Sequence, residues 1–202
     1  MIVIIDYGCG NLNAFLNIYR SNNIASKITN KKEDILNSTH IVLPGVGSFD
    51  NVMKSFNKSG LREIVEKKIL NSTPLLGICA GMQILSNKSE EGNEKGLGWI
   101  NGEVIRFDDN KIDSSTKTPH MGWNHVNFNN SNLFNGIKQN STFYFTHTYY
   151  FQPKDKNDII SSTNYGINFC SGINKNKIYG VQFHPEKSHD NGQKLLINFS
   201  KI

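Results

Sequence analysis

Short apolar runs alternate with amphipathic stretches in the first half of the chain. Three of the runs, at residues 2–5, 40–43 and 75–78, have the length and composition of buried strands. Between them, apolar residues recur at helical spacing over residues 12–19 and 61–69. Repetition of strand, helix and strand is typical of a parallel sheet with helices on its faces. Glycine or proline lies close to each strand and indicates tight turns at the edge of that sheet.

The second half changes to short segments in which apolar and polar residues alternate, as in strands. Six such segments cover residues 103–107, 123–128, 142–145, 159–163, 167–173 and 178–182. A polar loop is predicted at 108–118 and a final helix at 194–199. We find no internal repeat and no linker in the sequence. The pattern predicts one α/β domain over residues 1–202, in which a mostly parallel central sheet is flanked by helices and extended by antiparallel strands.

The charge pattern argues against nucleic acid as a partner. The net charge is +5, but Arg20, Arg62 and Arg106 are the only arginines, and the lysines are scattered among asparagines. The lysine pairs at 31–32 and 67–68 have acidic neighbours. A phosphate-binding face shows clustered rather than dispersed basic residues. We therefore expect no nucleic-acid partner.

Membrane and secretion signals are not found in the sequence either. It lacks a run of about eighteen apolar residues, so no membrane span is predicted. The first residues read as a buried strand that ends at Asp6, without the basic start and cleavage site of a signal peptide. A cytoplasmic protein is expected. Its three cysteines, Cys9, Cys79 and Cys170, are an odd number without metal-ligand spacing, which predicts free thiols and no metal or other cofactor.

Cys79 is the strongest candidate for a reacting group. It is the centre of a Gly-Ile-Cys-Ala-Gly motif that follows a predicted strand and precedes a helix-forming stretch. A strand–turn–helix elbow of this kind exposes a nucleophile, and its glycines admit a strained turn against neighbouring backbone. The amino terminus of the following helix favours a thiolate. Taken alone, the motif also fits a small buried thiol in a tight turn.

A base and an orienting acid are predicted near the end of the chain. An alternating segment ends at His184, Pro185 prevents continuation of the strand, and Glu186 follows. A thiol nucleophile needs a base, and the imidazole needs a carboxylate to fix its tautomer. Of the six histidines, His184 is the one with a carboxylate two residues away at a predicted strand end. The alternative is an ordinary surface histidine before a proline.

With these motifs in place, the sequence resembles the class I (triad-type) glutamine amidotransferases, and within them the glutaminase subunits of imidazole glycerol phosphate synthase. The matching segments are residues 5–12, 43–49, 77–83, 119–124, 147–150 and 180–188, in the order of the family. The resemblance implies a flavodoxin-like fold. It also implies that Cys79 attacks the side-chain amide of L-glutamine, that His184 acts as base and acid, and that Glu186 orients His184.

The resemblance implies further site residues. The backbone of Val46, between two glycines, and the N–H of Ala80 would bind the oxyanion of the tetrahedral intermediate. A set of residues would hold glutamine: Gly47, Gln83, Glu91, Thr148 and Tyr149. Glu90 and Glu94 are close in the sequence and are alternatives to Glu91 for this role. Ammonia would pass to a synthase subunit of (β/α)₈-barrel fold in a heterodimer, with Asn11, Trp123 and Lys187 at the interface.

One departure from the family pattern keeps alternatives open. The residue after the nucleophile is usually a larger aliphatic one in this family, and here it is Ala80. A related glutaminase subunit that supplies ammonia to a sugar-amidating enzyme of surface polysaccharide synthesis is the nearest alternative to a role in histidine biosynthesis. The others are a cysteine peptidase and a catalytically silent binding subunit. A deletion strain that grows normally without histidine would exclude the histidine role.

Overall fold

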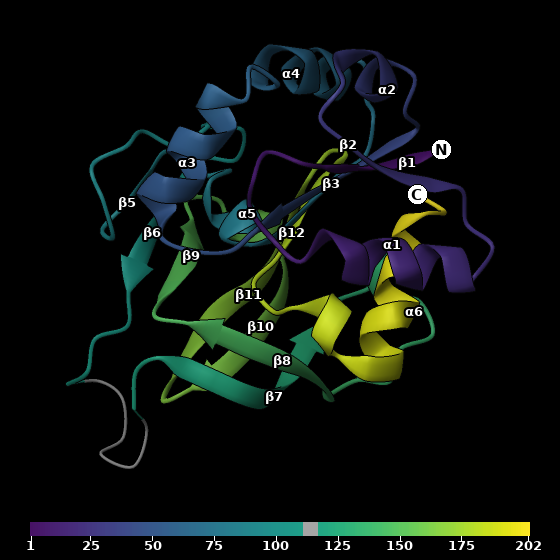
Figure 1. The fold of residues 1–202 in the computed structure, drawn as a ribbon. Coiled ribbons are helices and arrows are strands. Elements are labelled where there is room, and N and C mark those ends of the chain that lie inside the picture. Colours follow the sequence, from purple (N-terminus) through teal and green to yellow (C-terminus); the bar gives the residue numbers. More distant parts are fainter. Residues whose placement is uncertain (111–116) are drawn as a thin grey trace.

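A nine-stranded mixed sheet forms the centre of the computed structural model, which describes residues 1–110 and 117–202 (Figure 1). In spatial order its strands are β2 (Ser26–Thr29), β1 (Ile2–Ile5), β3 (His40–Gly45), β4 (Leu75–Cys79), β12 (Ile178–Val181), β11 (Ile167–Lys175), β10 (Ile159–Tyr165), β7 (His120–Phe128) and β8 (Ser141–His147). Neighbouring strands from β2 to β12 are parallel, and those from β12 to β8 are antiparallel. The predicted α/β class with its antiparallel extension is confirmed.

A second, three-stranded sheet lies beside the first, on the left of Figure 1. It consists of β5 (Lys88–Ser89), β6 (Gly102–Arg106) and β9 (Tyr149–Pro153), with β5 parallel and β9 antiparallel to β6. Only Thr148 separates β8 in the large sheet from β9 in the small one. This corner brings residues 147–149 toward the end of β4 (Leu75–Cys79).

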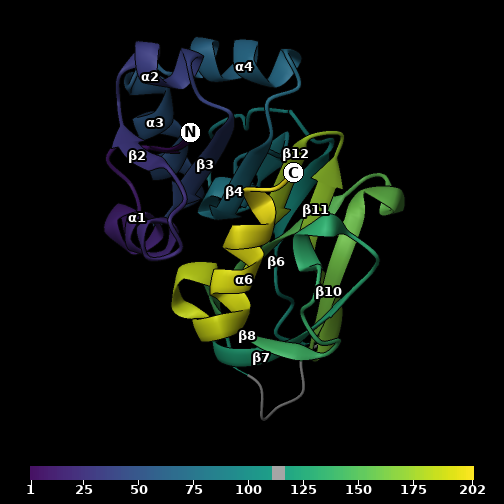
Figure 2. The ribbon, with the colours of Figure 1, turned by 90° about the vertical axis from the view of Figure 1, so that its right-hand side faces the viewer.

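Helices cover the parallel half of the sheet on both faces (Figures 1 and 2). On one face lie α1 (Leu12–Ser21) and α6 (His189–Phe199), whose apolar residues share a core. On the other lie α2 (Lys32–Leu36), α3 (Phe49–Lys58) and α4 (Arg62–Leu70), which contribute to a second core. With both faces covered, all four residues of β1 are buried, as expected for a strand in a parallel sheet.

The predicted elements differ from the structure at several polar segments and at the largely apolar strand β9, which was not predicted. Strand β2 reads Ser-Lys-Ile-Thr and buries only Thr29, because it lies at the edge of the sheet. Helix α3 was not predicted, although its buried residues follow a helical spacing. The last strand ends at Val181 rather than at residue 182, and the last helix begins at His189 rather than at residue 194. Part of the predicted loop at 108–118 lies outside the described residues.

Helix α6 starts early because its first turns pack on a short 3-10 turn at Pro185–Lys187. A Cβ on Gly192 would lie 1.9 Å from the Pro185 carbonyl oxygen, so only glycine permits this approach. The polar first turns of α6 therefore lie directly after the segment that carries His184. Among the described residues, no helix is long and apolar enough to span a membrane.

Candidate active site

Cys79 occupies a strained turn at the carboxyl end of β4. Its φ of 54° and ψ of −116° lie in a region that non-glycine residues rarely adopt. The strand continues directly into the short helix α5 (Ala80–Gln83). Reversal of the chain within one residue projects the side chain beyond the edge of the sheet. The predicted elbow is therefore present, and Cys79 is at its apex.

Two glycines let the elbow pack against the neighbouring strand. A Cβ on Gly45 would lie 2.1 Å from the nitrogen of Gly81, and a Cβ on Gly81 would lie 2.0 Å from the Leu43 carbonyl oxygen. Gly45 pairs with Cys79 in the register of β3 and β4. This close approach places the backbone after β3 next to Cys79.

His184 and Glu186 form a buried pair beside the nucleophile. The Nδ1 of His184 lies 2.8 Å from Oε1 of Glu186, and the two side chains are 3% and 2% exposed. The backbone N–H of His184 donates to the Tyr144 carbonyl at 2.8 Å, and the Ser188 hydroxyl donates to the His184 carbonyl at 2.6 Å. These two bonds hold the backbone of His184 through its own N–H and carbonyl groups.

Charge stabilises the protonated form of His184. Burial lowers the pKa of its imidazole, but interactions with Cys79 and with the Glu186 carboxylate raise that pKa more, so that it reaches about 10. Among the described residues, Nε2 of His184 has no geometrically aligned hydrogen-bond partner. Cys79 thus lies close enough to the imidazole to interact with it directly.

A pocket of about 300 Å³ opens in front of Cys79 and His184. Most of the predicted site residues line it: Val46, Gly47, Cys79, Ala80, Gln83, Glu91, Thr148, Tyr149, His184 and Lys187. Glu186 lies behind His184, while Asn11 and Trp123 do not line the pocket. Pro119, Thr146 and His147 line it as well and were not predicted as site residues.

The segment after β3 forms one wall of the pocket. Gly47 has a φ of 109°, which requires glycine in practice, and the Val46 side chain is 53% exposed. The Tyr7 hydroxyl donates a hydrogen bond to the Pro44 carbonyl just before this segment. Val46 and Ala80 thus face the same pocket from two adjacent strand ends, as the oxyanion prediction requires.

The polar end of the pocket is built by Gln83 and Glu91. The buried Gln83 amide nitrogen donates to the Tyr149 carbonyl at 2.9 Å and to Oε1 of Gln182 at 3.1 Å. The Glu91 carboxylate accepts a hydrogen bond of 2.7 Å from the backbone N–H of Phe49, at the start of α3.

Glu90 and Glu94, the two alternatives to Glu91, interact with other groups. The Glu90 carboxylate accepts from the backbone N–H of Arg106, and Glu94 lies 3.9 Å from the ammonium of Lys54. Of the three carboxylates, Glu91 is the one that lines the pocket.

The side-chain amide of Gln182, which the sequence did not single out, donates to the Cys79 sulfur at 3.7 Å. Its position follows from the strand pairing of β12 with β4 rather than from any motif.

Exposed apolar side chains lie on β7, which pairs with the pocket-lining residue Thr146. Trp123 is 48% exposed and stacks on His189 with ring centroids 5.0 Å apart. Met121, two residues away on the same face of β7, is 64% exposed. Tyr144 pairs with Trp123 in the register of β7 and β8. The Lys187 ammonium lies over the Tyr144 ring. Asn11 is exposed at the start of α1.

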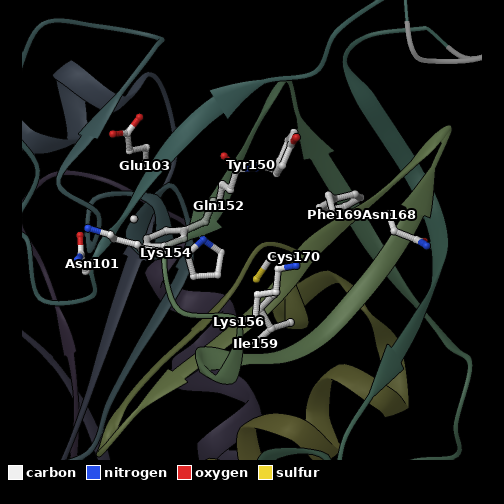
Figure 3. Close-up of a pocket in the computed structure, with 13 residues that line it drawn as sticks. Asn101, Glu103, Tyr150, Gln152, Lys154, Lys156, Ile159, Asn168, Phe169 and Cys170 are labelled. Carbon is white, nitrogen blue, oxygen red and sulfur yellow. The ribbon is translucent and has the colours of Figure 1, made fainter.

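A second cavity, of about 470 Å³, lies between β9 and the strands β10 and β11 (Figure 3). The sulfur of Cys170 faces this cavity, donates to the Gly172 carbonyl at 3.4 Å and is buried. Burial raises the pKa of the Cys170 thiol to about 12, so it stays protonated at neutral pH. Across residues 1–110 and 117–202, no group of three or more His, Cys, Asp or Glu side chains is arranged to hold a metal ion.

Comparison with known proteins shows the family of the chain. The family model for glutamine amidotransferase class-I matches residues 3–202. One chain of the PurLQS structure from Thermotoga maritima superimposes with a TM-score of 0.74 at 16% identity, covering 98% of this chain and 96% of that chain. A structure described as a glutamine amidotransferase superimposes with a TM-score of 0.74 at 17% identity over the full length of both chains. The chain belongs to the class-I glutamine amidotransferase family.

Relatives with higher sequence identity show to which family within this class the chain belongs. The imidazole glycerol phosphate synthase subunit HisH of Leptospira borgpetersenii is 45% identical over 100% of both chains. Subunit HisH 2 of Methanococcus maripaludis is 48% identical over 100% of this chain and 99% of its own. Within its class, the chain therefore belongs to the family of the imidazole glycerol phosphate synthase subunit HisH. The resemblance found in the sequence is confirmed.

Proposed function

We propose that this chain is the glutaminase subunit of an imidazole glycerol phosphate synthase and hydrolyses L-glutamine to glutamate and ammonia for histidine biosynthesis. One observation carries the proposal. Cys79 lies at the apex of a strained elbow, and His184 and Glu186, a buried pair joined at 2.8 Å, lie beside it. This is the geometry that nucleophilic catalysis by a thiol requires.

The reaction begins from a thiolate of Cys79 and a protonated His184. The sulfur attacks the side-chain amide carbon of glutamine and forms a tetrahedral intermediate. Backbone N–H groups of the Val46 segment and of Ala80 stabilise its oxyanion, where loss of one donor typically costs about 3 kcal/mol. His184 then protonates the leaving nitrogen, the carbon–nitrogen bond breaks, and ammonia departs.

Water completes the cycle. The neutral imidazole of His184 takes a proton from a water molecule, whose oxygen attacks the thioester carbon. Collapse of the second tetrahedral intermediate breaks the carbon–sulfur bond, releases glutamate and restores the thiolate beside a charged imidazolium. The Glu186 carboxylate stabilises that charge and holds the ring in one tautomer.

The polar end of the pocket suits the amino-acid end of glutamine. In this proposal the Glu91 carboxylate binds the α-ammonium group, and Gln83 with the backbone of Gly47, Thr148 and Tyr149 binds the remaining polar atoms; all five residues line the same pocket. A fixed carboxylate on an ammonium group forms a charge-assisted hydrogen bond, which is stronger than one between neutral groups. The side-chain amide of the substrate then points toward Cys79.

A synthase subunit is the partner to which ammonia passes. The named relatives are themselves synthase subunits, and the exposed Met121 and Trp123 lie near a pocket lined by Val46 and Lys187. Clustered exposed apolar residues with an aromatic anchor are typical of protein interfaces. We propose a heterodimer with a (β/α)₈-barrel subunit that covers this side of the molecule, with Asn11, Trp123 and Lys187 in the interface.

Genetic complementation tests the proposed function. The chain is expressed in a strain that lacks its own glutaminase subunit for histidine synthesis, together with the synthase subunit from the same source. We expect growth without histidine for the native chain and for Cys170→Ala, and no growth for Cys79→Ala at a low external ammonium concentration. Growth of the Cys79→Ala strain equal to that of the native strain would contradict the mechanism. Failure of the native chain to support growth would contradict the pathway.

A further inference from the structure

A chain of hydrogen bonds lies behind the wall of the glutamine pocket. The Asn124 side-chain amide contacts Nε2 of His120 at 3.1 Å, and Nδ1 of His120 contacts Nε2 of His147 at 3.0 Å. Nδ1 of His147 in turn contacts the carbonyl oxygen of Tyr149 at 2.8 Å. We call these three side chains, Asn124, His120 and His147, the histidine relay.

The tautomers of both histidines in the relay follow from the Tyr149 carbonyl oxygen at its end. A carbonyl oxygen only accepts, so His147 Nδ1 carries a hydrogen and its Nε2 is the acceptor. His120 must then donate from Nδ1, which leaves its Nε2 to accept from the amide of Asn124. Each contact thus has one donor and one acceptor, and both rings are neutral.

Their surroundings keep the two rings neutral and immobile. His120 and His147 are 2% and 7% exposed. Burial lowers the pKa of His120 to about 4; burial and the neighbouring His120 lower the pKa of His147 to about 3. His120 lies between two stacked rings, with centroids 4.6 Å from Phe145 and 3.9 Å from Tyr165. The relay therefore has a single arrangement at neutral pH.

The relay ends on a carbonyl that is also bound from the catalytic side. Tyr149 O accepts a second hydrogen bond, of 2.9 Å, from the Gln83 amide. Gln83 also binds Gln182, whose amide contacts the Cys79 sulfur at 3.7 Å. His147 and Gln83 thus hold the same peptide oxygen from two sides, at the corner where β8 turns into β9.

We propose that His147, oriented by His120 and Asn124, is a positioning residue for glutamine binding that fixes the peptide backbone at Thr148 and Tyr149. This inference rests on the proposed function. His147, Thr148 and Tyr149 line the pocket in front of Cys79, so a shift of this corner changes the shape of the pocket directly. The relay begins one residue after Trp123, on a strand that borders the proposed partner surface.

The side of the relay away from the active site is closed by aromatic rings. Phe169 lies 5.3 Å from His147 between ring centroids, and Tyr150 lies 5.6 Å from Phe169. Figure 3 shows Phe169 and Tyr150 at the second cavity. These aromatic rings cover the His147 ring on that side. Among the described residues, the polar contacts of the His147 ring are therefore those with His120 and with the Tyr149 carbonyl.

Substitutions at position 147 separate positioning from general stability. In the complex with its synthase subunit, His147→Leu removes one donor from the Tyr149 carbonyl and is expected to raise KM for glutamine about tenfold with kcat changed less than about twofold, the scale of one lost buried hydrogen bond. His147→Asn places an amide N–H where Nδ1–H lies and is expected to restore KM to within about threefold. His125→Leu, on the exposed part of the same strand, is the matched control and should leave KM unchanged.

Direct binding gives the second readout. In the Cys79→Ala background, which cannot turn over glutamine, calorimetry should show the same rise in Kd for His147→Leu and its partial rescue by Asn. If His147→Leu does not assemble with the partner, Asn124→Ala replaces it, with an expected rise of about threefold. Unchanged KM and Kd, a fall in kcat at constant KM, or no rescue by Asn would overturn the inference. Turnover by Cys79→Ala itself would instead contradict the proposed function.

Discussion

Glu186 holds His184 through a contact of 2.8 Å between Oε1 and Nδ1, and both side chains are almost completely buried. The two residues are separated by Pro185 alone, so one turn of the chain carries both the proposed base and its proposed orienting acid. The pair lies after β12 (Ile178–Val181), which is parallel to the strand that ends at Cys79. The three residues of the proposed triad therefore come from the ends of two adjacent parallel strands.

Removal of the Glu186 charge is expected to disable catalysis without unfolding the chain. Glu186→Gln keeps the shape of the side chain but offers no charge to the imidazolium. We expect kcat of the complex to fall about ten-thousandfold, the scale seen when the orienting carboxylate of a triad is made neutral. Glu63→Gln, on the surface of α4, is the control. A Glu186→Gln variant with native kcat would show that the carboxylate is not part of the reaction.

The raised pKa of His184 gives a pH dependence of stability with a definite sign. Burial lowers that pKa, while Cys79 and Glu186 raise it to about 10. A base whose pKa is raised in the folded state stabilises folding when it is charged. The contribution is complete below the pKa of an unfolded histidine, about 6.5, and is lost as the pH rises through about 10.

Urea unfolding measures this dependence. The difference in the free energy of unfolding between the native chain and His184→Gln should be largest near pH 6 and should shrink toward about pH 10. The same experiment with His125→Gln, at an exposed position, should show a difference that stays small throughout. A difference that grows with pH would reverse the assigned sign.

The packing of the elbow predicts a large effect of a single methyl group. Gly81→Ala would place Cβ 2.0 Å from the Leu43 carbonyl oxygen, which the backbone of β3 must move to accommodate. We expect a loss of about 3 kcal/mol or more in the free energy of unfolding, since overpacked sites against backbone are costly. Gly60→Ala, at a φ of 67° with nothing within 4 Å of the new Cβ, should cost only about 1 kcal/mol.

Glu91 is expected to determine affinity for glutamine. Glu91→Gln retains an oxygen to accept from the Phe49 N–H but loses the negative charge. KM should rise about thirtyfold, as for a lost charge-assisted contact worth about 2 kcal/mol, while the melting temperature changes little. Glu90→Gln and Glu94→Gln should leave KM near the native value, because their carboxylates do not line the pocket. An equal effect of all three would indicate that only overall charge matters.

Trp123 is expected to anchor the partner. Trp123→Ala should weaken binding of the synthase subunit by about 2 kcal/mol, or roughly thirtyfold in Kd, as for a central aromatic residue of an interface. At saturating partner, glutaminase turnover should return to near the native rate. Trp99→Phe, which is distant from the pocket mouth and bonded to Glu66, serves as the control. Native affinity of Trp123→Ala would place the interface elsewhere.

Site residues could be predicted from the sequence where a short motif marks them, but not where their role depends on contacts between distant strands. Cys79, His184 and Glu186 could be proposed from the sequence because each lies in a short motif whose neighbours have a physical purpose. Gln182 and His147 could not, because their roles arise only when distant strands are brought together. Strand β2 was missed because an edge strand buries one face at most, and its sequence then resembles a loop.

Strand β12 lies between β4 and β11, although it follows every other strand of the described residues in the sequence. During synthesis the centre of the large sheet therefore stays open until residues 178–181 have left the ribosome. Before that moment the thiol at the tip of β4 lacks the imidazole of His184, which follows β12 in the sequence. Glutamine cleavage thus becomes possible only in a chain whose last strand has inserted, so a nascent chain that has not reached this point cannot release free ammonia.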